Sequence, residues 1–133
     1  MIVVDTNVLA YLYLPGEHTA RAEALLERDP DWAAPVLWRS ELRNVLIGYV
    51  RRGTLRLDTA RAIQAEAEGL MSGNEHDVAS PTVLELAHDT GCSAYDCEFA
   101  AVAIALGVKL VTMDAQMLRA FPGSAVALTT QMP

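Results

Sequence analysis

Short apolar runs alternate along the chain with longer segments whose apolar residues recur at helical spacing. The short runs predict β-strands over residues 1–4, 32–36, 77–79, 108–112 and 125–128. Between them, periodicity and helix-boundary residues predict helices over 8–12, 17–28, 37–52, 57–71, 82–90 and 93–106, with a short one ending at residue 120. Such alternation favours an α/β fold built on a parallel sheet whose short strands are covered on both faces.

Composition narrows the class of protein. The length of 133 residues suits one domain, which we expect to span residues 1–133. Hydrophobic residues make up 52% of the chain, which indicates a packed core. The longest apolar stretch, residues 99–108, is about half as long as a bilayer-spanning helix, and the first residues lack the pattern of a signal peptide, so we expect a cytoplasmic protein without a membrane segment. Cys92 and Cys97 lack partners at zinc-ligand spacing, which favours buried free thiols.

The charge of the chain is unevenly distributed. A net charge of −7 argues at first against a polyanionic partner, because proteins that bind nucleic acids usually carry a basic surface. Residues 39–61, however, have a net charge of +4, whereas the rest of the chain carries −11. A solvated helix face explains this segment as well as a surface for RNA phosphates or a protein partner does. The candidates for such contacts are Arg39, Arg43, Arg51 and Arg52.

Four acidic residues fall at positions that a parallel sheet would bring to one edge. Asp5 and Asp114 each follow a predicted strand, and Glu41 and Asp96 each fall in the first turn of a predicted helix. The ligand site of such a sheet lies beyond the carboxyl ends of its strands, near the point where the strand order reverses. We therefore expect the four carboxylates to converge there.

Each acid taken alone also has an ordinary structural role. Asp5 and Asp114 suit strand-to-helix turns. Ser93 and Asp96 have the spacing of a capping box, and an acid such as Glu41 is favourable at a helix N-terminus. Four carboxylates held together would nevertheless repel one another, which raises their pKa values and lowers stability. Mg²⁺ or Mn²⁺ would relieve that repulsion and prefers oxygen ligands, so the cluster as a whole predicts a metal site.

A metal site of this kind suits the hydrolysis of phosphodiesters. One or two divalent ions can activate a water molecule and stabilise the leaving oxygen of an in-line displacement. Thr6 and Thr112 are candidates to hold metal-bound water through their hydroxyls, with capping or strand packing as the simpler role. Asn7 is a candidate to hydrogen-bond Asp5 or the substrate, with a turn as its simpler role.

Four sequence blocks around these acids resemble PIN-domain ribonucleases, particularly the VapC-type toxins of bacterial toxin–antitoxin pairs. The blocks are VVDTNVL at 3–9, SELRNVL at 40–46, AYDCEFAAVA at 94–103 and LVTMD at 110–114. The tripeptide DTN alone would be a weak signal, but all four blocks in this order and spacing are a specific one. The resemblance covers nearly the whole chain.

The resemblance implies a three-layer α/β/α sandwich with a central short-stranded parallel sheet. It also implies Mg²⁺ or Mn²⁺ as cofactor and endonucleolytic cleavage of RNA by metal-activated water. Metal-ligand and catalytic roles pass to Asp5, Glu41, Asp96 and Asp114, with Thr6 and Thr112 as supporting neighbours. Glu98 departs from the family pattern, and we expect it at the surface or behind the ligands. The family further implies a homodimer and a cognate antitoxin protein that docks on the toxin and blocks the site.

Two other classes of protein fit the sequence less well. The first is a catalytically silent PIN-fold module for RNA binding or assembly, which would be expected to lack one of the four acids. The second is a receiver-like or phosphatase-like domain with Asp5 as its phosphate acceptor. A phosphatase of that type would carry a second acid two residues later, where this chain has Asn7. The sequence also lacks a glycine-rich phosphate loop.

Overall fold

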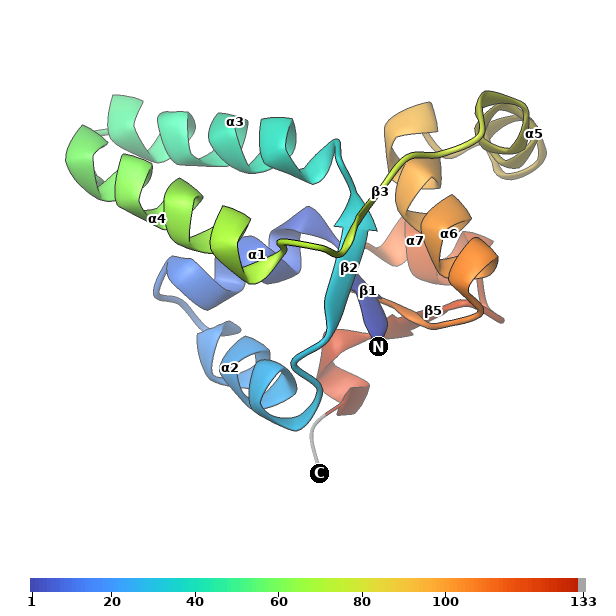
Figure 1. The fold of residues 1–133 in the computed structure, drawn as a ribbon, viewed down its shortest axis with the longest axis horizontal. Coiled ribbons are helices and arrows are strands. Elements are labelled where there is room, and N and C mark those ends of the chain that lie inside the picture. The colour runs from blue at the N-terminus through green and yellow to red at the C-terminus, as the bar shows by residue number, and fades with distance from the viewer. Residues whose placement is uncertain (132–133) are drawn as a thin grey trace.

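A parallel sheet lies at the centre of the computed structural model, which describes residues 1–131 (Figure 1). Its strands are β1 (Ile2–Val4), β2 (Trp32–Pro35), β3 (Glu75–His76), β4 (Leu110–Thr112) and β5 (Ala125–Ala127). They lie in the order β3-β2-β1-β4-β5, and each neighbouring pair is parallel. The strand order reverses between β1 and β4, which is where a parallel α/β sheet forms its ligand site.

Helices cover both faces of this sheet (Figure 1). One side carries α1 (Thr6–Tyr13), α2 (Thr19–Arg28), α3 (Trp38–Arg51) and α4 (Leu57–Leu70), and the other carries α5 (Ser80–Thr90), α6 (Ala94–Leu106) and α7 (Ala115–Ala120). A 3-10 helix over Leu128–Gln131 follows β5. The expected three-layer α/β/α sandwich is therefore confirmed. Over residues 1–131, no helix is long and apolar enough to span a membrane.

The core forms where the apolar strands meet one helix from each side. Every residue of β1, β2 and β4 is buried. On one face α6 buries its Ala-rich segment from Phe99 to Ala103, whose small side chains allow a close approach to the sheet. On the other face α1 buries Val8, Leu9 and Ala10. Both cysteines are free and buried, as the sequence predicted.

The third strand lies earlier in the chain than predicted. It is Glu75–His76 rather than residues 77–79. These two residues pair in register with Ala34 and Pro35 at the end of β2. The sequence prediction was wrong because a two-residue strand is selected by the partner that it pairs with, and neither residue has a strong strand preference of its own.

Several element boundaries also differ from the prediction, among them the start of the first helix and the end of the last strand. Thr6 and Asn7, expected to precede the first helix, are its first two residues, and Asp5 occupies the N-cap position. The last strand ends at Ala127, because Leu128 already belongs to the 3-10 helix. Both shifts are of one or two residues, which is the scale on which element ends fray.

Arg39 joins α3 to α4 and to β3 through all three of its side-chain nitrogens. Its Nε and Nη2 donate to the two carboxylate oxygens of Glu75 at 2.6 Å each, and its Nη1 donates to Glu68 Oε1 at 2.9 Å. Trp38 Nε1 also donates to Glu75, at 2.9 Å. Three of the five N–H donors of Arg39 are thus used within the fold, and its role in RNA or partner contacts stays a prediction.

Replacing Glu75 by Gln should lower the thermal midpoint of unfolding by a few degrees at pH 7, because the amide loses the charge that Arg39 binds. The Arg39 hydrogen bonds lower the pKa of Glu75 below its ordinary value of 4.5, against the opposing effect of burial. A carboxylate whose pKa is lowered by folding stabilises the fold above its unfolded pKa, and this contribution is lost as the pH falls through the folded pKa. The difference between wild type and Glu75→Gln should therefore narrow as the pH is lowered from 4.5.

The measurement is the thermal midpoint of both proteins across an acidic pH series. Glu85→Gln is the matched control, since Glu85 is exposed and makes no hydrogen bond or ion pair within the described chain. A difference between wild type and Glu75→Gln that stays constant with pH would show that the charge of Glu75 is not what stabilises this junction.

Candidate active site

Asp5 and Asp114 stand beyond the carboxyl ends of the two central strands. β1 and β4 pair in parallel through Val4 and Val111, and the Asp5 N–H donates to the Val111 carbonyl at 3.0 Å. Asp5 is the N-cap residue of α1, and Asp114 is that of α7, where its Oδ1 accepts the Met117 N–H at 3.0 Å. The pairing of the strands thus brings together two acids that lie far apart in the sequence.

Glu41 and Asp96 approach the same place from helix N-termini. Glu41 lies in the first turn of α3, which follows β2, and Asp96 lies in the first turn of α6. The Asp96 N–H donates to the hydroxyl oxygen of the N-cap residue Ser93 at 3.0 Å, so Ser93 caps α6 and one of the two bonds of the predicted capping box is present. All four acids line one pocket of about 220 Å³, together with Thr6, Asn7, Asn44 and Val45. The convergence expected from the sequence is observed.

Two buried hydroxyls hold two of the carboxylates in place. Thr6 Oγ1 donates to Glu41 Oε1, and Thr112 Oγ1 donates to Asp5 Oδ2, both at 2.7 Å. Thr112 Oγ1 also accepts the Asp114 N–H at 3.0 Å, so one hydroxyl connects the acids that follow β1 and β4. The threonine hydroxyls therefore contact the carboxylates directly, whereas the sequence suggested that they bind water.

Burial and then the charges of neighbouring carboxylates raise the pKa values of Asp5, Glu41 and Asp96. Burial is the largest cause of the raised pKa of Asp5, and the charges of Asp96 and Asp114 add to it. Burial also raises the pKa of Glu41, with further increases from the charges of Asp5, Asp96 and Glu98. For Asp96 the causes are burial and then the charge of Asp114. The pocket is therefore a place where negative charge is unfavourable without a compensating cation.

No protein cation compensates these charges within residues 1–131. None of the four carboxylates lies within 4.0 Å of a Lys, Arg, His or N-terminal nitrogen. The same residues contain no group of three or more His, Cys, Asp or Glu side chains already arranged to enclose a metal ion. The site is thus an open, acid-lined pocket. Such a donor set fits Mg²⁺ or Mn²⁺, because Mg²⁺ usually keeps several waters and takes only one or two carboxylates.

Sequence reasoning missed part of the pocket lining. Asn44 and Val45 lie three and four residues after Glu41 on α3, and this helical spacing was the signal that could have placed them at the site. Asn7 contacts Asp5 through its backbone N–H, a bond that lowers the pKa of Asp5. Glu98 is half-buried outside the pocket lining, yet close enough for its charge to affect Glu41.

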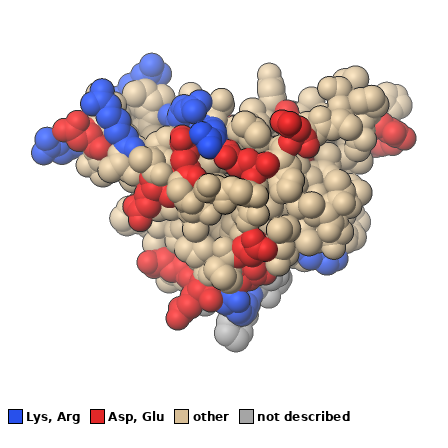
Figure 2. Space-filling view, in the orientation of Figure 1, with Lys and Arg blue, Asp and Glu red and all other residues tan. Residues whose placement is uncertain are grey.

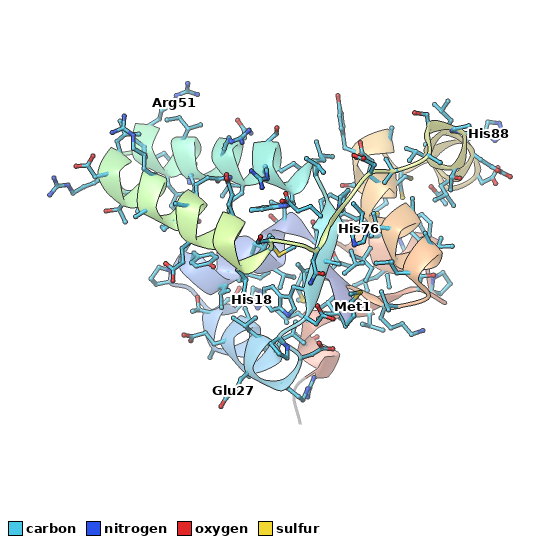
Figure 3. All side chains as sticks on the ribbon, in the orientation of Figure 1. Met1, His18, Glu27, Arg51, His76 and His88 are labelled. Atoms are coloured by element: carbon cyan, nitrogen blue, oxygen red, sulfur yellow. The ribbon has the colours of Figure 1, made fainter. Side chains whose placement is uncertain are left out.

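The remaining predicted arginines lie on α3 and at its C-cap, which is Arg52. Figure 2 shows most of the basic side chains on this face gathered over α3 and α4. The side chain of Arg43, which directly precedes the pocket residue Asn44, is 57% exposed. Arg51 extends from the outer end of α3 (Figure 3). Arg52 lies over the ring of Tyr49 at 4.6 Å. Arg43 Nη2 also lies 3.9 Å from Glu68 Oε2, at the edge of the network that Arg39 forms, whereas Arg51 makes no ion pair among residues 1–131.

Comparisons with known proteins agree on one family. The sequence model of the PIN domain matches residues 2–121. The chain is 32% identical over 124 residues to Ribonuclease VapC3 of Pyrobaculum aerophilum, covering 91% of this chain and 95% of that protein.

Solved structures show the same fold. PAE2754 from Pyrobaculum aerophilum superimposes with a TM-score of 0.79 at 22% identity, covering 97% of this chain and 90% of that one. A toxin–antitoxin complex from Klebsiella pneumoniae contains a chain that superimposes with a TM-score of 0.69 at 19% identity, covering 96% and 98%. The likeness extends over all the elements that carry the four acids.

Proposed function

Because this chain belongs to the PIN-domain family, we propose that it is a metal-dependent endoribonuclease and the toxin of a toxin–antitoxin pair. The observation that carries the proposal is one pocket lined by four carboxylates that lack a cationic partner in the described chain: Asp5, Glu41, Asp96 and Asp114. The similarity to Ribonuclease VapC3 supports RNA as the substrate. The similarity to a chain of a toxin–antitoxin complex supports the toxin role.

Each acid has a distinct part in this proposal. Asp5, Glu41 and Asp96 would bind Mg²⁺ or Mn²⁺ through their carboxylates, and Asp114 would act through water because one of its oxygens caps α7. The bound cation supplies the positive charge and Lewis acidity that phosphodiester hydrolysis requires. The chain's own contribution is orientation, since Thr6 and Thr112 hold Glu41 and Asp5 toward the pocket.

The exposed arginines of α3 would contact the RNA backbone. Arg43, Arg51 and Arg52 carry positive charge along the helix that also supplies Glu41 to the pocket. Phosphate contacts of this kind are electrostatic, so RNA binding should weaken as the salt concentration rises.

The test is RNA cleavage by the purified protein with Mg²⁺, with Mn²⁺ and with a chelator, on structured and unstructured RNA. Cleavage should occur only when metal is present. Metal should also raise the thermal midpoint, since saturation to 100 times the Kd stabilises a fold by about 2.7 kcal/mol. Cleavage that persists in chelator would contradict the proposal, and binding of RNA without cleavage would support the silent PIN-fold module instead.

Thr112→Val should raise the metal concentration needed for half-maximal cleavage by roughly 10- to 100-fold. Valine keeps the shape of the buried side chain but removes the hydroxyl that donates to Asp5 and accepts from the Asp114 N–H. Thr59→Val is the control, because Thr59 is exposed on α4 and its hydroxyl makes no bond within the described residues. An unchanged metal requirement would show that Thr112 does not position the acids.

The proposed partners are a cognate antitoxin and a second copy of the chain. The proposed location of the complex is the cytoplasm. Exposed apolar side chains on α5 and α6, namely Leu84, Ile104 and Leu106, offer surface for such contacts. Co-expression with the protein encoded next to this chain should relieve growth arrest, and sedimentation should show a dimer. Growth arrest that the neighbouring protein does not relieve would argue against the toxin–antitoxin pair.

A further inference from the structure

A second cavity adjoins the acid-lined pocket. It measures about 260 Å³ and lies between α1, α3 and the turn that connects α1 to α2. Asn7 and Val45 line both this cavity and the acid-lined pocket, so the two are neighbours along the same pair of helices. One helical turn further on, Tyr11 follows Asn7 on α1 and Tyr49 follows Val45 on α3, a rise of about 6 Å in each helix.

Part of the wall of this cavity is aromatic. The half-buried rings of Tyr11, His18 and Tyr49 line it. Tyr11 and His18 contact each other with ring centroids 4.7 Å apart and planes tilted by 48°, so neither ring face is fully covered by the other. His18 lies on the side of the sheet that carries α1 and α2 (Figure 3). Arg52 places a guanidinium over the Tyr49 ring at 4.6 Å.

One buried polar atom at this wall lacks a partner. His18 Nδ1 makes no hydrogen bond in the part of the chain that the structure describes, whereas His18 Nε2 lies 3.5 Å from the carboxylate of Glu17, which also lines the cavity. An imidazole nitrogen can donate or accept according to its tautomer, so it can pair with either kind of polar edge. The exposed Asn7 side chain adds an amide donor and a carbonyl acceptor at the junction with the acid-lined pocket.

The negative charge of the acid-lined pocket also affects a side chain of this cavity. The pKa of Tyr11 is raised first by burial and then by the charge of Asp5. The Tyr11 hydroxyl therefore lies within the electric field of Asp5. Because the two cavities share Asn7 and Val45, a group seated against Tyr11 would lie next to whatever the acid-lined pocket binds.

We propose that this cavity is a subsite for one unpaired nucleobase of the RNA, next to the phosphodiester that is cleaved. The proposal rests on the proposed function and extends it to the kind of RNA that is bound. Tyr11 and Tyr49 supply ring faces for stacking, and His18 and Asn7 supply hydrogen bonds to the edge of the base. A base can enter only when it is unstacked and unpaired, so the subsite selects single-stranded segments over duplex RNA.

The test measures binding of an unstructured RNA of roughly 12 nucleotides by fluorescence anisotropy in Mg²⁺, with every variant built on Asp96→Asn to prevent cleavage. Tyr11→Leu should weaken binding roughly 5- to 150-fold, the range for loss of one base–aromatic stack. Tyr11→Phe, which keeps the ring, should bind within about twofold of the parent. Tyr13→Leu is the matched control, because Tyr13 lies on the same helix but lines a different cavity.

A second arm identifies what the subsite holds. A series of RNAs is prepared, each lacking one base at a different position. Only one RNA of the series should bind the parent protein more weakly than the complete RNA does. That RNA should bind Tyr11→Leu as tightly as it binds the parent protein, because the stacking contact is already absent. The RNA paired with its complement should bind the parent more weakly than the single strand.

Two results would overturn the subsite. One is RNA binding by Tyr11→Leu that matches the parent; if that variant also no longer binds the neighbouring gene product, the cavity is a protein-docking site. The other is that the losses of affinity caused by Tyr11→Leu and by base removal add together. In each case metal-dependent cleavage by the wild type would leave the ribonuclease proposal standing, whereas absence of both cleavage and RNA binding would remove both proposals.

Discussion

Replacing Asp5 by Asn should reduce metal-dependent RNA cleavage by roughly 100-fold or more, while the metal-free protein remains folded and resists heat better than wild type. The loss follows from the removal of one carboxylate from the acid-lined pocket. An amide oxygen is a weaker ligand for Mg²⁺ than a carboxylate because it lacks the full negative charge.

The gain in stability follows from the position of Asp5. Its carboxylate is largely buried, and burial together with the charges of Asp96 and Asp114 raises its pKa. A raised carboxyl pKa means that folding disfavours the charged form, which is the form present at neutral pH. Asn removes the charge and keeps an oxygen that accepts the Thr112 hydroxyl, so the hydrogen bond at 2.7 Å has a replacement acceptor.

The two halves of this prediction require two measurements. Cleavage rates in Mg²⁺ test the loss of activity, and thermal midpoints in chelator and in Mg²⁺ test stability with and without metal. Asp77→Asn is the control, since Asp77 is exposed and makes no hydrogen bond or ion pair among residues 1–131. A less stable, inactive Asp5→Asn would show that the charge of Asp5 stabilises the metal-free fold, and a fully active one would remove Asp5 from the site.

Trp38→Ala should lower the free energy of unfolding by about 3–5 kcal/mol, a large share of the ~5–15 kcal/mol that stabilises a typical domain. Trp38 is fully buried at the start of α3, and its Nε1 donates to Glu75. The substitution leaves a cavity and removes one of the donors that hold the Glu75 carboxylate. Because Glu41 lies one turn later on the same helix, cleavage should fall as well.

Urea denaturation measures this effect, with the slope of the transition checking that the unfolded state is unchanged. Leu84→Ala on α5 is the control, since Leu84 is 65% exposed and its loss should change stability by no more than ~0.5 kcal/mol. A loss below about 1 kcal/mol in Trp38→Ala would mean that the surrounding core can close around the missing ring.

Much of the fold and of the pocket was predictable because the signals are local. The run Ile2–Val4 is apolar and β-branched, and Asp5 directly follows it, so strand, cap and helix could be placed from a few neighbouring residues. The same holds for Ser93 and Asp96, whose capping spacing fixes the start of α6. With parallel strands, such local assignments bring the acids to one edge of the sheet.

Other features depend on which segments meet, and no local pattern contains that information. The short strand β3 follows its register with β2, and Arg39 points to Glu75 rather than to solvent because α3 passes beside β3. The two threonine hydroxyls bond carboxylates that lie 35 and 107 residues away, so sequence alone could only suggest capping or water binding for them.

The sequence by itself determined the α/β alternation and the positions of the four acids at strand ends and helix starts, because propensity, periodicity and capping act over a few residues. Only the tertiary structure decided that Thr112 joins Asp5 to Asp114, that Arg39 is used internally, and that an aromatic cavity adjoins the acids. These features arise from packing between distant segments, where the contacts depend on the relative placement of whole helices and strands.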